Sequence, residues 1–119
     1  MCEVFLLRDL GPFEIEVRGS VTEDDSVAVL SMVIEHLPDA SDAVVDLRDA
    51  SRLDSATAHR LVELLDSRLA DGVCFVVVAD DPWDIRLLTA AGISPSAIVA
   101  DRRTAQRALS RIGRIGVAS

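Results

Sequence analysis

The chain has 119 residues, which is enough for one domain and leaves little room for a second. Half of its residues are hydrophobic and 27% are charged, a composition that excludes intrinsic disorder and the small disulfide-stapled proteins. No apolar run approaches the roughly 20 residues that a bilayer span needs, and the first residues lack the basic cluster of a signal peptide. We therefore expect one cytoplasmic domain, residues 1–119, that does not insert into a membrane.

Charge is distributed unevenly along the chain. Residues 1–101 hold 7 Arg and 20 acidic residues, a net charge of −13, whereas residues 102–119 hold 5 Arg and no acidic residue, a net charge of +5. A body this acidic repels a phosphate backbone, so nucleic acid is not an expected partner. The C-terminal arginines are expected to lie on a helix and to complement the acidic body.

The N-terminal part predicts a β-hairpin followed by a helix. Val4–Leu7 is a short apolar run, and after a turn at residues 11–12 the chain alternates between apolar and charged side chains over residues 13–17. This alternation is typical of a half-exposed strand. Apolar residues at helical spacing then predict a helix over 27–37. Its expected buried stripe consists of Val29, Leu30, Val33, Ile34 and Leu37.

The middle of the chain alternates strands with a clear helix. Continuous apolar runs at Ala43–Leu47 and Val73–Ala79 predict two inner strands, buried on both faces. Between them, an amphipathic helix is expected over 58–69, closed by Gly72 just past its end. The expected buried stripe of this helix consists of Ala58, Leu61, Val62, Leu65 and Leu69.

Three shorter elements complete the chain. Asp81-Pro82 opens a helix that Gly92 ends, Ile98–Ala100 is a last strand, and Thr104–Ile112 is a last helix. The order is therefore β-β-α-β-α-β-α-β-α. Strand–helix–strand units require parallel strands with right-handed crossovers, while the hairpin makes the first strand antiparallel. The predicted fold class is α/β, with a mixed, mostly parallel sheet and helices packed on it.

The usual signatures of enzymes and metal sites are missing from the sequence. It contains no GxxxxGK[ST] or GxGxxG phosphate loop and no GxSxG nucleophile elbow. Two cysteines and two histidines are scattered without ligand spacing, so no metal and no cofactor are expected. Cys74 lies inside an apolar strand and is expected to be buried and unreactive, whereas Cys2 is expected to be exposed.

One arrangement invites a catalytic interpretation. Ser55 and His59 are four residues apart on one helix and so share a face, and Asp46 or Asp49 could complete a triad with them. A capping serine and a solvated histidine are the favoured interpretation, because most such arrangements in sequences are fortuitous.

Residues 44–65, VVDLRDASRLDSATAHRLVELL, carry a further pattern. A buried strand ends in Asp46-Leu47, and after a short loop Asp54-Ser55 opens the next helix. This segment resembles the STAS domain, the fold of bacterial anti-sigma factor antagonists, in which a hydrophobic strand ends in Asp-Leu and Asp-Ser-[Ser/Thr]-Gly begins the following helix. The resemblance extends to the order of elements over nearly the whole chain and to Gly19, which matches a glycine at the end of the second strand.

The resemblance implies a binding protein without enzymatic activity. It would capture an anti-sigma factor of the serine-kinase type while unphosphorylated, so that a sigma factor is freed for transcription, and phosphorylation at Ser55 would switch it off. The Gly19–Asp25 loop and the exposed face of the helix over 58–69 would form the contact surface. Ala56 and Thr57 stand where the family has Ser or Thr and Gly. The expected partner-binding residues are Asp54, Ala56, Thr57, Thr22, Glu23 and Arg60.

Two other functions remain open at this point. The chain could be a STAS subunit of an ABC-type membrane transport assembly, docked on an ATPase through the same helix face without any kinase. It could also be a scaffold that is never phosphorylated. The sequence leaves open whether the chain forms a homodimer.

Overall fold

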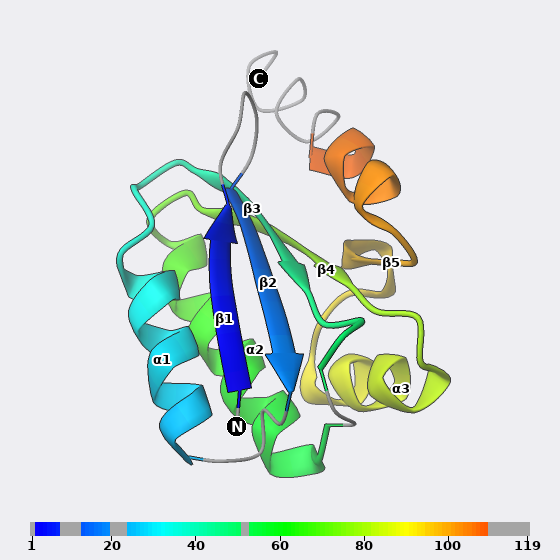
Figure 1. Cartoon of the computed structure of the whole chain (residues 1–119). Helices are drawn as coiled ribbons and strands as arrows, with labels where there is room; N and C mark the ends of the chain where they lie inside the picture. The colour runs from blue at the N-terminus through cyan, green and yellow to red at the C-terminus, as the bar shows by residue number, and fades with distance from the viewer. Residues whose placement is uncertain (1, 8–12, 20–23, 51–52, 110–119) are drawn as a thin grey trace.

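The structure of the protein is a computed structural model that describes residues 2–7, 13–19, 24–50 and 53–109. In this part of the chain, five strands form one sheet in the order β1-β2-β3-β4-β5 (Figure 1). The first two strands are antiparallel, and the second to fifth are parallel to one another. The expected mixed, mostly parallel sheet is thereby confirmed. The strands are β1 (Cys2–Leu7), β2 (Phe13–Gly19), β3 (Asp42–Asp46), β4 (Cys74–Val78) and β5 (Ile98–Val99).

Three helices connect the parallel strands. They are α1 (Asp24–Glu35), α2 (Ser55–Leu69) and α3 (Pro82–Ala91). Each connection moves the chain to the next strand in the same direction across the sheet, so the three helices fall on one face. A short 3-10 turn over Pro95–Ala97 precedes β5, and residues 102–109 form a last helix. In Figure 1 this last helix, in orange, lies apart from the α1 and α2 layer.

Two apolar clusters hold the layers together. The larger one lies between the sheet and the three connecting helices, and its fully or nearly fully buried members include Ile15, Val45, Val77, Ile34, Leu61 and Leu88. The smaller one lies on the other face, where Ala105 and Leu109 of the last helix cover Val44, Val76 and Val78. Neighbouring residues of β3 therefore belong to different clusters. The prediction that β3 is buried on both faces is confirmed.

The predicted C-terminal end of α2 and both predicted ends of α3 hold. Gly72, with φ of +80°, donates to the Leu69 carbonyl at 3.0 Å, and Val73 donates to the Arg68 carbonyl at 3.2 Å. This pair of hydrogen bonds is the double closure expected when a left-handed glycine follows a helix. Asp81 caps α3 and Gly92 follows its last residue, as predicted.

Two hydrophobic residues of the predicted buried stripes are exposed instead of buried. Val29 is 47% exposed, because the buried stripe is narrower: it consists of Leu30 and Ile34 in α1 and of Leu37 just after the helix. Leu69 is 55% exposed at the end of α2. Beside it the mostly covered Arg68 side chain takes the inward place and donates to the Leu37 carbonyl oxygen. The hydrophobic pattern was therefore wrong at these two positions.

Two polar side chains also differ from expectation. Glu16 was predicted to lie on the exposed side of β2, but it is only 7% exposed. The last helix approaches this face, and Arg102 lies 2.9 Å from the Glu16 carboxylate. Cys74 is partly exposed instead of buried, because it is the first residue of β4. The side chain of Cys2 lies outside the described part.

The helices begin earlier than the apolar pattern predicted. α1 begins at Asp24, α2 at Ser55 and the last helix at residue 102, each two or three residues ahead of its expected start. The first turn of a helix is often polar, since capping groups must satisfy its free N–H groups, so the apolar stripe starts late. Within the described residues, no helix is long and apolar enough to cross a membrane.

Candidate functional site

The start of α2 is built around Asp54. Its backbone is extended, with φ of −104° and ψ of 169°, and its carboxylate Oδ1 accepts the Thr57 N–H at 2.7 Å. Its carbonyl oxygen accepts the Ala58 N–H at 3.0 Å, which closes the first helical turn. This is the arrangement of an N-cap residue. Ser55 is thereby fixed as the first residue of the helix.

The structure brings together four of the residues expected at the site. Asp54, Ser55, Ala56 and Arg60 are all exposed on the N-terminal half of α2. Thr57 is 7% exposed, so it offers little surface of its own to a partner. Its backbone and side chain turn toward Asp54 instead and take part in the cap.

In the sequence, the expected Gly19–Asp25 loop follows the end of β2. Thr22 and Glu23 lie outside the described residues. The end of β2 beside that loop is described, and Gly19 donates its N–H to the Asp49 carbonyl at 3.2 Å. Gly19 also forms a parallel bridge with Ala50. The chain that leads from β3 toward Ser55 is thus tied to the end of β2.

The charge next to Ser55 is fixed by the cap. Hydrogen bonds from the backbone N–H of Thr57 and then from its side chain lower the pKa of Asp54. The Asp54 carboxylate is therefore ionised at neutral pH and lies beside an exposed serine. The free N–H groups of the first turn place partial positive charge at the same point.

The triad interpretation with Asp46 as its third member fails on geometry. A hydrogen bond of 2.9 Å joins His59 Nδ1 to the backbone carbonyl oxygen of Ser55, so that nitrogen is the donor. Asp46 is buried, and its carboxylate accepts from Arg48 at 3.0 Å and from Arg102 at 2.9 Å. Strand alternation places Asp46 with Val44, on the face that the last helix covers, away from α2. The three residues therefore do not come together.

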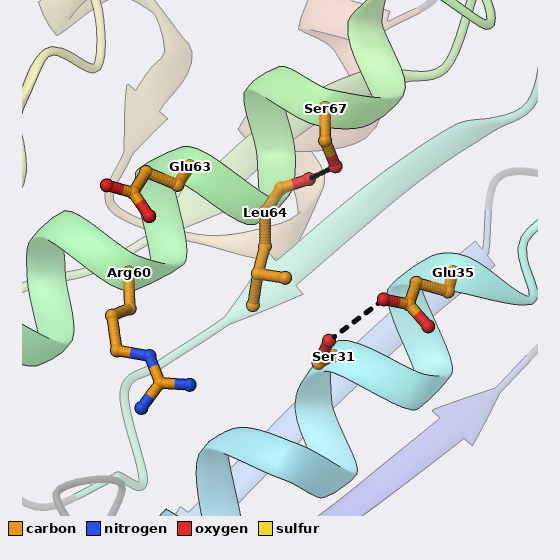
Figure 2. Close-up of a pocket in the computed structure, with 6 residues that line it drawn as sticks. All are labelled: Ser31, Glu35, Arg60, Glu63, Leu64 and Ser67. Atoms are coloured by element: carbon orange, nitrogen blue, oxygen red, sulfur yellow. Dashed lines mark hydrogen bonds between the residues drawn. The ribbon is translucent and has the colours of Figure 1, made fainter.

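Arg60 also lines a groove between α1 and α2. Figure 2 shows the two helices side by side, with each of two hydroxyls bonded within its own helix. Ser31 donates to Glu35 at 3.3 Å, and Ser67 donates to the Leu64 carbonyl at 2.7 Å. The full lining is Ser31, Glu35, Arg60, Glu63, Leu64 and Ser67. The groove extends the exposed polar face of α2 away from Ser55.

Two residues of α3 reach the site, and the sequence analysis missed them. The Trp83 indole Nε1 donates to the Leu53 carbonyl oxygen at 3.1 Å, and Asp84 Oδ1 accepts the Leu53 N–H at 3.0 Å. Leu53 directly precedes Asp54. No local pattern could have indicated these contacts, because the partners are about 30 positions apart in the chain.

We compared the chain with known proteins. No protein-family model and no curated protein sequence matches it. Among solved structures, an anti-sigma factor antagonist from Mycobacterium paratuberculosis matches with a TM-score of 0.74 at 18% identity, over 95% of each chain. This chain has the fold of an anti-sigma factor antagonist. The STAS fold that the segment around Ser55 suggested is thus confirmed over nearly the whole chain.

A second solved structure matches over a smaller share of both chains. The crystal structure of a protein called Mglu matches with a TM-score of 0.59 at 18% identity. It covers 66% of this chain, and this chain spans 20% of the Mglu chain. The two therefore share a fold over part of this chain, and the Mglu polypeptide is much longer.

Proposed function

We propose that this protein is an anti-sigma factor antagonist that binds an anti-sigma factor of the serine-kinase type. In this proposal the unphosphorylated chain captures the anti-sigma factor, and phosphorylation at Ser55 releases it. The observation that carries the proposal is the exposed Ser55 at the first position of α2, directly after the capping Asp54, on a STAS fold. The setting would be the cytoplasm of a bacterium, and the role would be binding without catalysis.

The proposed contact surface is the N-terminal half of α2. Asp54, Ala56 and Arg60 flank Ser55 and are exposed. Thr22 and Glu23 also stay in the proposal, because they follow Gly19 in the chain. The backbone N–H of Gly19 donates to the carbonyl oxygen of Asp49, which lies on the segment that leads from β3 to Ser55. Thr57 also stays in the proposal, although at 7% exposure it offers little surface of its own. The surface is therefore a short, mostly polar patch centred on one hydroxyl.

The switch follows from the charge that phosphorylation adds. A phosphate brings about −1.5 to −2 charges at neutral pH, and the start of a helix tolerates an anion. The fold of α2 should therefore survive modification of Ser55. A partner surface shaped to accept a neutral hydroxyl would have to accommodate the bulk of the phosphate and remove its bound water. Binding is expected to fall while stability is retained.

Overall charge supports a basic partner surface. Residues 1–101 carry a net charge of −13, so a positively charged docking face would be drawn to the body of the protein. Such attraction weakens as salt screens it. We therefore expect the association rate to fall as the ionic strength rises.

The test measures binding to each purified kinase-type anti-sigma factor of the source organism. Ser55→Ala should bind as the wild type does and should not be phosphorylated with ATP. Ser55→Asp should bind at least about tenfold more weakly, a difference of about 1.4 kcal/mol. The matched control is Ser67→Asp, an exposed serine farther along α2, which should bind normally.

Three results would contradict the proposal. Equal binding of Ser55→Asp and the wild type would exclude the switch at Ser55, and phosphate on another residue would move the site. No binding of the wild type to any kinase-type anti-sigma factor would exclude antagonism. A transport-assembly subunit or a scaffold would then be the better interpretation, and a self-association measurement would test for a homodimer.

A further inference from the structure

The first turn of α3 holds both backbone polar groups of Leu53. Asp84 Oδ1 accepts the Leu53 N–H at 3.0 Å, and the indole N–H of Trp83 donates to the Leu53 carbonyl oxygen at 3.1 Å. We call Trp83 and Asp84 the α3 pair. Because Leu53 directly precedes Asp54, the α3 pair contacts the chain two residues before Ser55.

The α3 pair is itself held firmly. The Asp81 carboxylate accepts the Trp83 N–H at 2.8 Å, and Pro82 occupies the first turn of α3, where its fixed φ suits a helix. Asp84 is 5% exposed and its bond to Leu53 is buried. A buried carboxylate loses water, so its protein partners determine where it lies. Side chains on a capped helix position a neighbour more precisely than side chains on a loop.

The segment that contains Ser55 is therefore fixed at both ends. On one side, Leu53 is held by the α3 pair, and its own side chain lies in the larger apolar cluster. On the other side, Thr57 is bonded to the Asp54 carboxylate at 2.7 Å. Between these points only Ser55 and Ala56 follow Asp54, and all three are exposed.

We propose that the α3 pair consists of positioning residues for Ser55. By holding Leu53, Trp83 and Asp84 set the place of the N-cap and of the exposed hydroxyl that an anti-sigma factor would recognise. This inference rests on the proposed function. It adds to that function a second helix, distant in sequence, on which recognition depends.

Asp84 gives the sharper test of the two. Because it is 5% exposed, it offers almost no surface to a partner, so an effect of Asp84 on binding is transmitted through the residues that it holds, Leu53 among them. Trp83 is 44% exposed and could also touch a partner directly. Variants of Asp84 therefore separate positioning from direct contact.

The first experiment measures amide hydrogen exchange in the free protein. Asp84→Ala should raise the exchange rate at Leu53 by at least about tenfold relative to Val76 in β4, because the buried N–H loses its acceptor. Asp84→Asn keeps an acceptor oxygen and should restore most of the protection. The matched control is Thr89→Ala, which removes a hydrogen bond to Ile85 on the same helix, away from Leu53.

The second experiment measures affinity for a purified kinase-type anti-sigma factor that binds the wild type. Asp84→Ala should bind about five- to tenfold more weakly, Asp84→Asn within about twofold of the wild type, and Thr89→Ala unchanged. Trp83→Phe keeps the ring and loses the donor, so it should weaken binding about two- to threefold. It also serves as the test if Asp84→Ala does not fold.

The outcomes separate this inference from the proposed function. Normal Leu53 exchange in Asp84→Ala, or faster exchange with unchanged affinity, would overturn the positioning role and leave the proposed function standing. A wild type that binds no kinase-type anti-sigma factor would overturn both. Weaker binding by Asp84→Ala, rescued by Asp84→Asn, supports the inference.

Discussion

Arg102 and Asp46 are 56 positions apart in the sequence, and their side chains meet at 2.9 Å on the face of the sheet opposite α2. Arg102 also lies 2.9 Å from the carboxylate of Glu16 and 3.3 Å from that of Glu14. One guanidinium on the last helix therefore contacts three carboxylates on two strands. Arg102 thereby complements the acidic body of the protein.

We predict that Arg102→Gln lowers the free energy of unfolding by about 1–3 kcal/mol. The loss is limited because Arg48 still bonds Asp46 and Arg18 still bonds Glu16. Urea unfolding measures the change. The matched control is Arg103→Gln, an exposed neighbour that should change stability by less than about 0.5 kcal/mol. Equal stabilities for the two variants would show that the contacts contribute nothing.

The same contacts predict loss of stability in acid. Hydrogen bonds from Arg18 lower the pKa of Glu16. Burial acts to raise the pKa of Asp46, but hydrogen bonds from Arg48 and Arg102 outweigh burial and lower it. Carboxyl groups with a lowered pKa in the folded state stabilise it above their unfolded value, which is about 4. That stability is lost as the pH falls through the folded pKa.

The acid prediction is checked by urea unfolding at a series of pH values from about 6 down to 3. The wild type should lose stability below about pH 4. Arg102→Gln should lose less over the same interval, since part of the stabilisation is already gone. Parallel curves for the two proteins would refute the link to Arg102.

We predict unequal effects from two leucines on α2. Leu65 is buried in the larger cluster, so Leu65→Ala should lower the free energy of unfolding by about 2–4 kcal/mol. Leu69 is exposed, so Leu69→Ala should cost less than about 1 kcal/mol. Thermal or urea unfolding of both variants provides the comparison. A large loss from Leu69→Ala would mean that this residue is covered after all, as its spacing had suggested.

Cys74 should react slowly although it is partly exposed. Burial raises the pKa of its thiol, and the charge of Asp42 raises it further, so little thiolate is present at neutral pH. In a Cys2→Ser background, where Cys74 is the remaining cysteine, Asp42→Asn should raise the rate of thiol labelling by roughly two- to threefold. Asp66→Asn, an exposed change on α2, is the control. An unchanged labelling rate in Asp42→Asn would mean that burial alone raises the pKa of the Cys74 thiol.

Local chemistry made much of the fold predictable. Hydrophobic spacing gave the strands and helices their order, and Asp54-Ser55, Asp81-Pro82 and the glycines at 72 and 92 marked their ends. These signals act over a few residues, so they can be detected without knowing what packs against them. The position of Ser55 at the start of α2 belongs to this group.

Burial and long-range contacts were decided by the tertiary structure. Glu16 lies on the charged side of an alternating strand, yet it is buried because a helix more than 80 positions later places Arg102 beside it. Thr57 turns into the cap, and Leu69 stays exposed because Arg68 occupies the inward place.

The α3 pair shows the same division at the candidate site. Asp54 and Ser55 could be read from their own segment, because an N-cap and a first helical residue depend on neighbours three or four positions away. That Trp83 and Asp84 hold Leu53 depends on how α3 packs beside α2, which residue spacing does not encode. The sequence alone thus placed Asp54 and Ser55 at the opening of this helix, and only the packing of a distant helix decided what holds them in place.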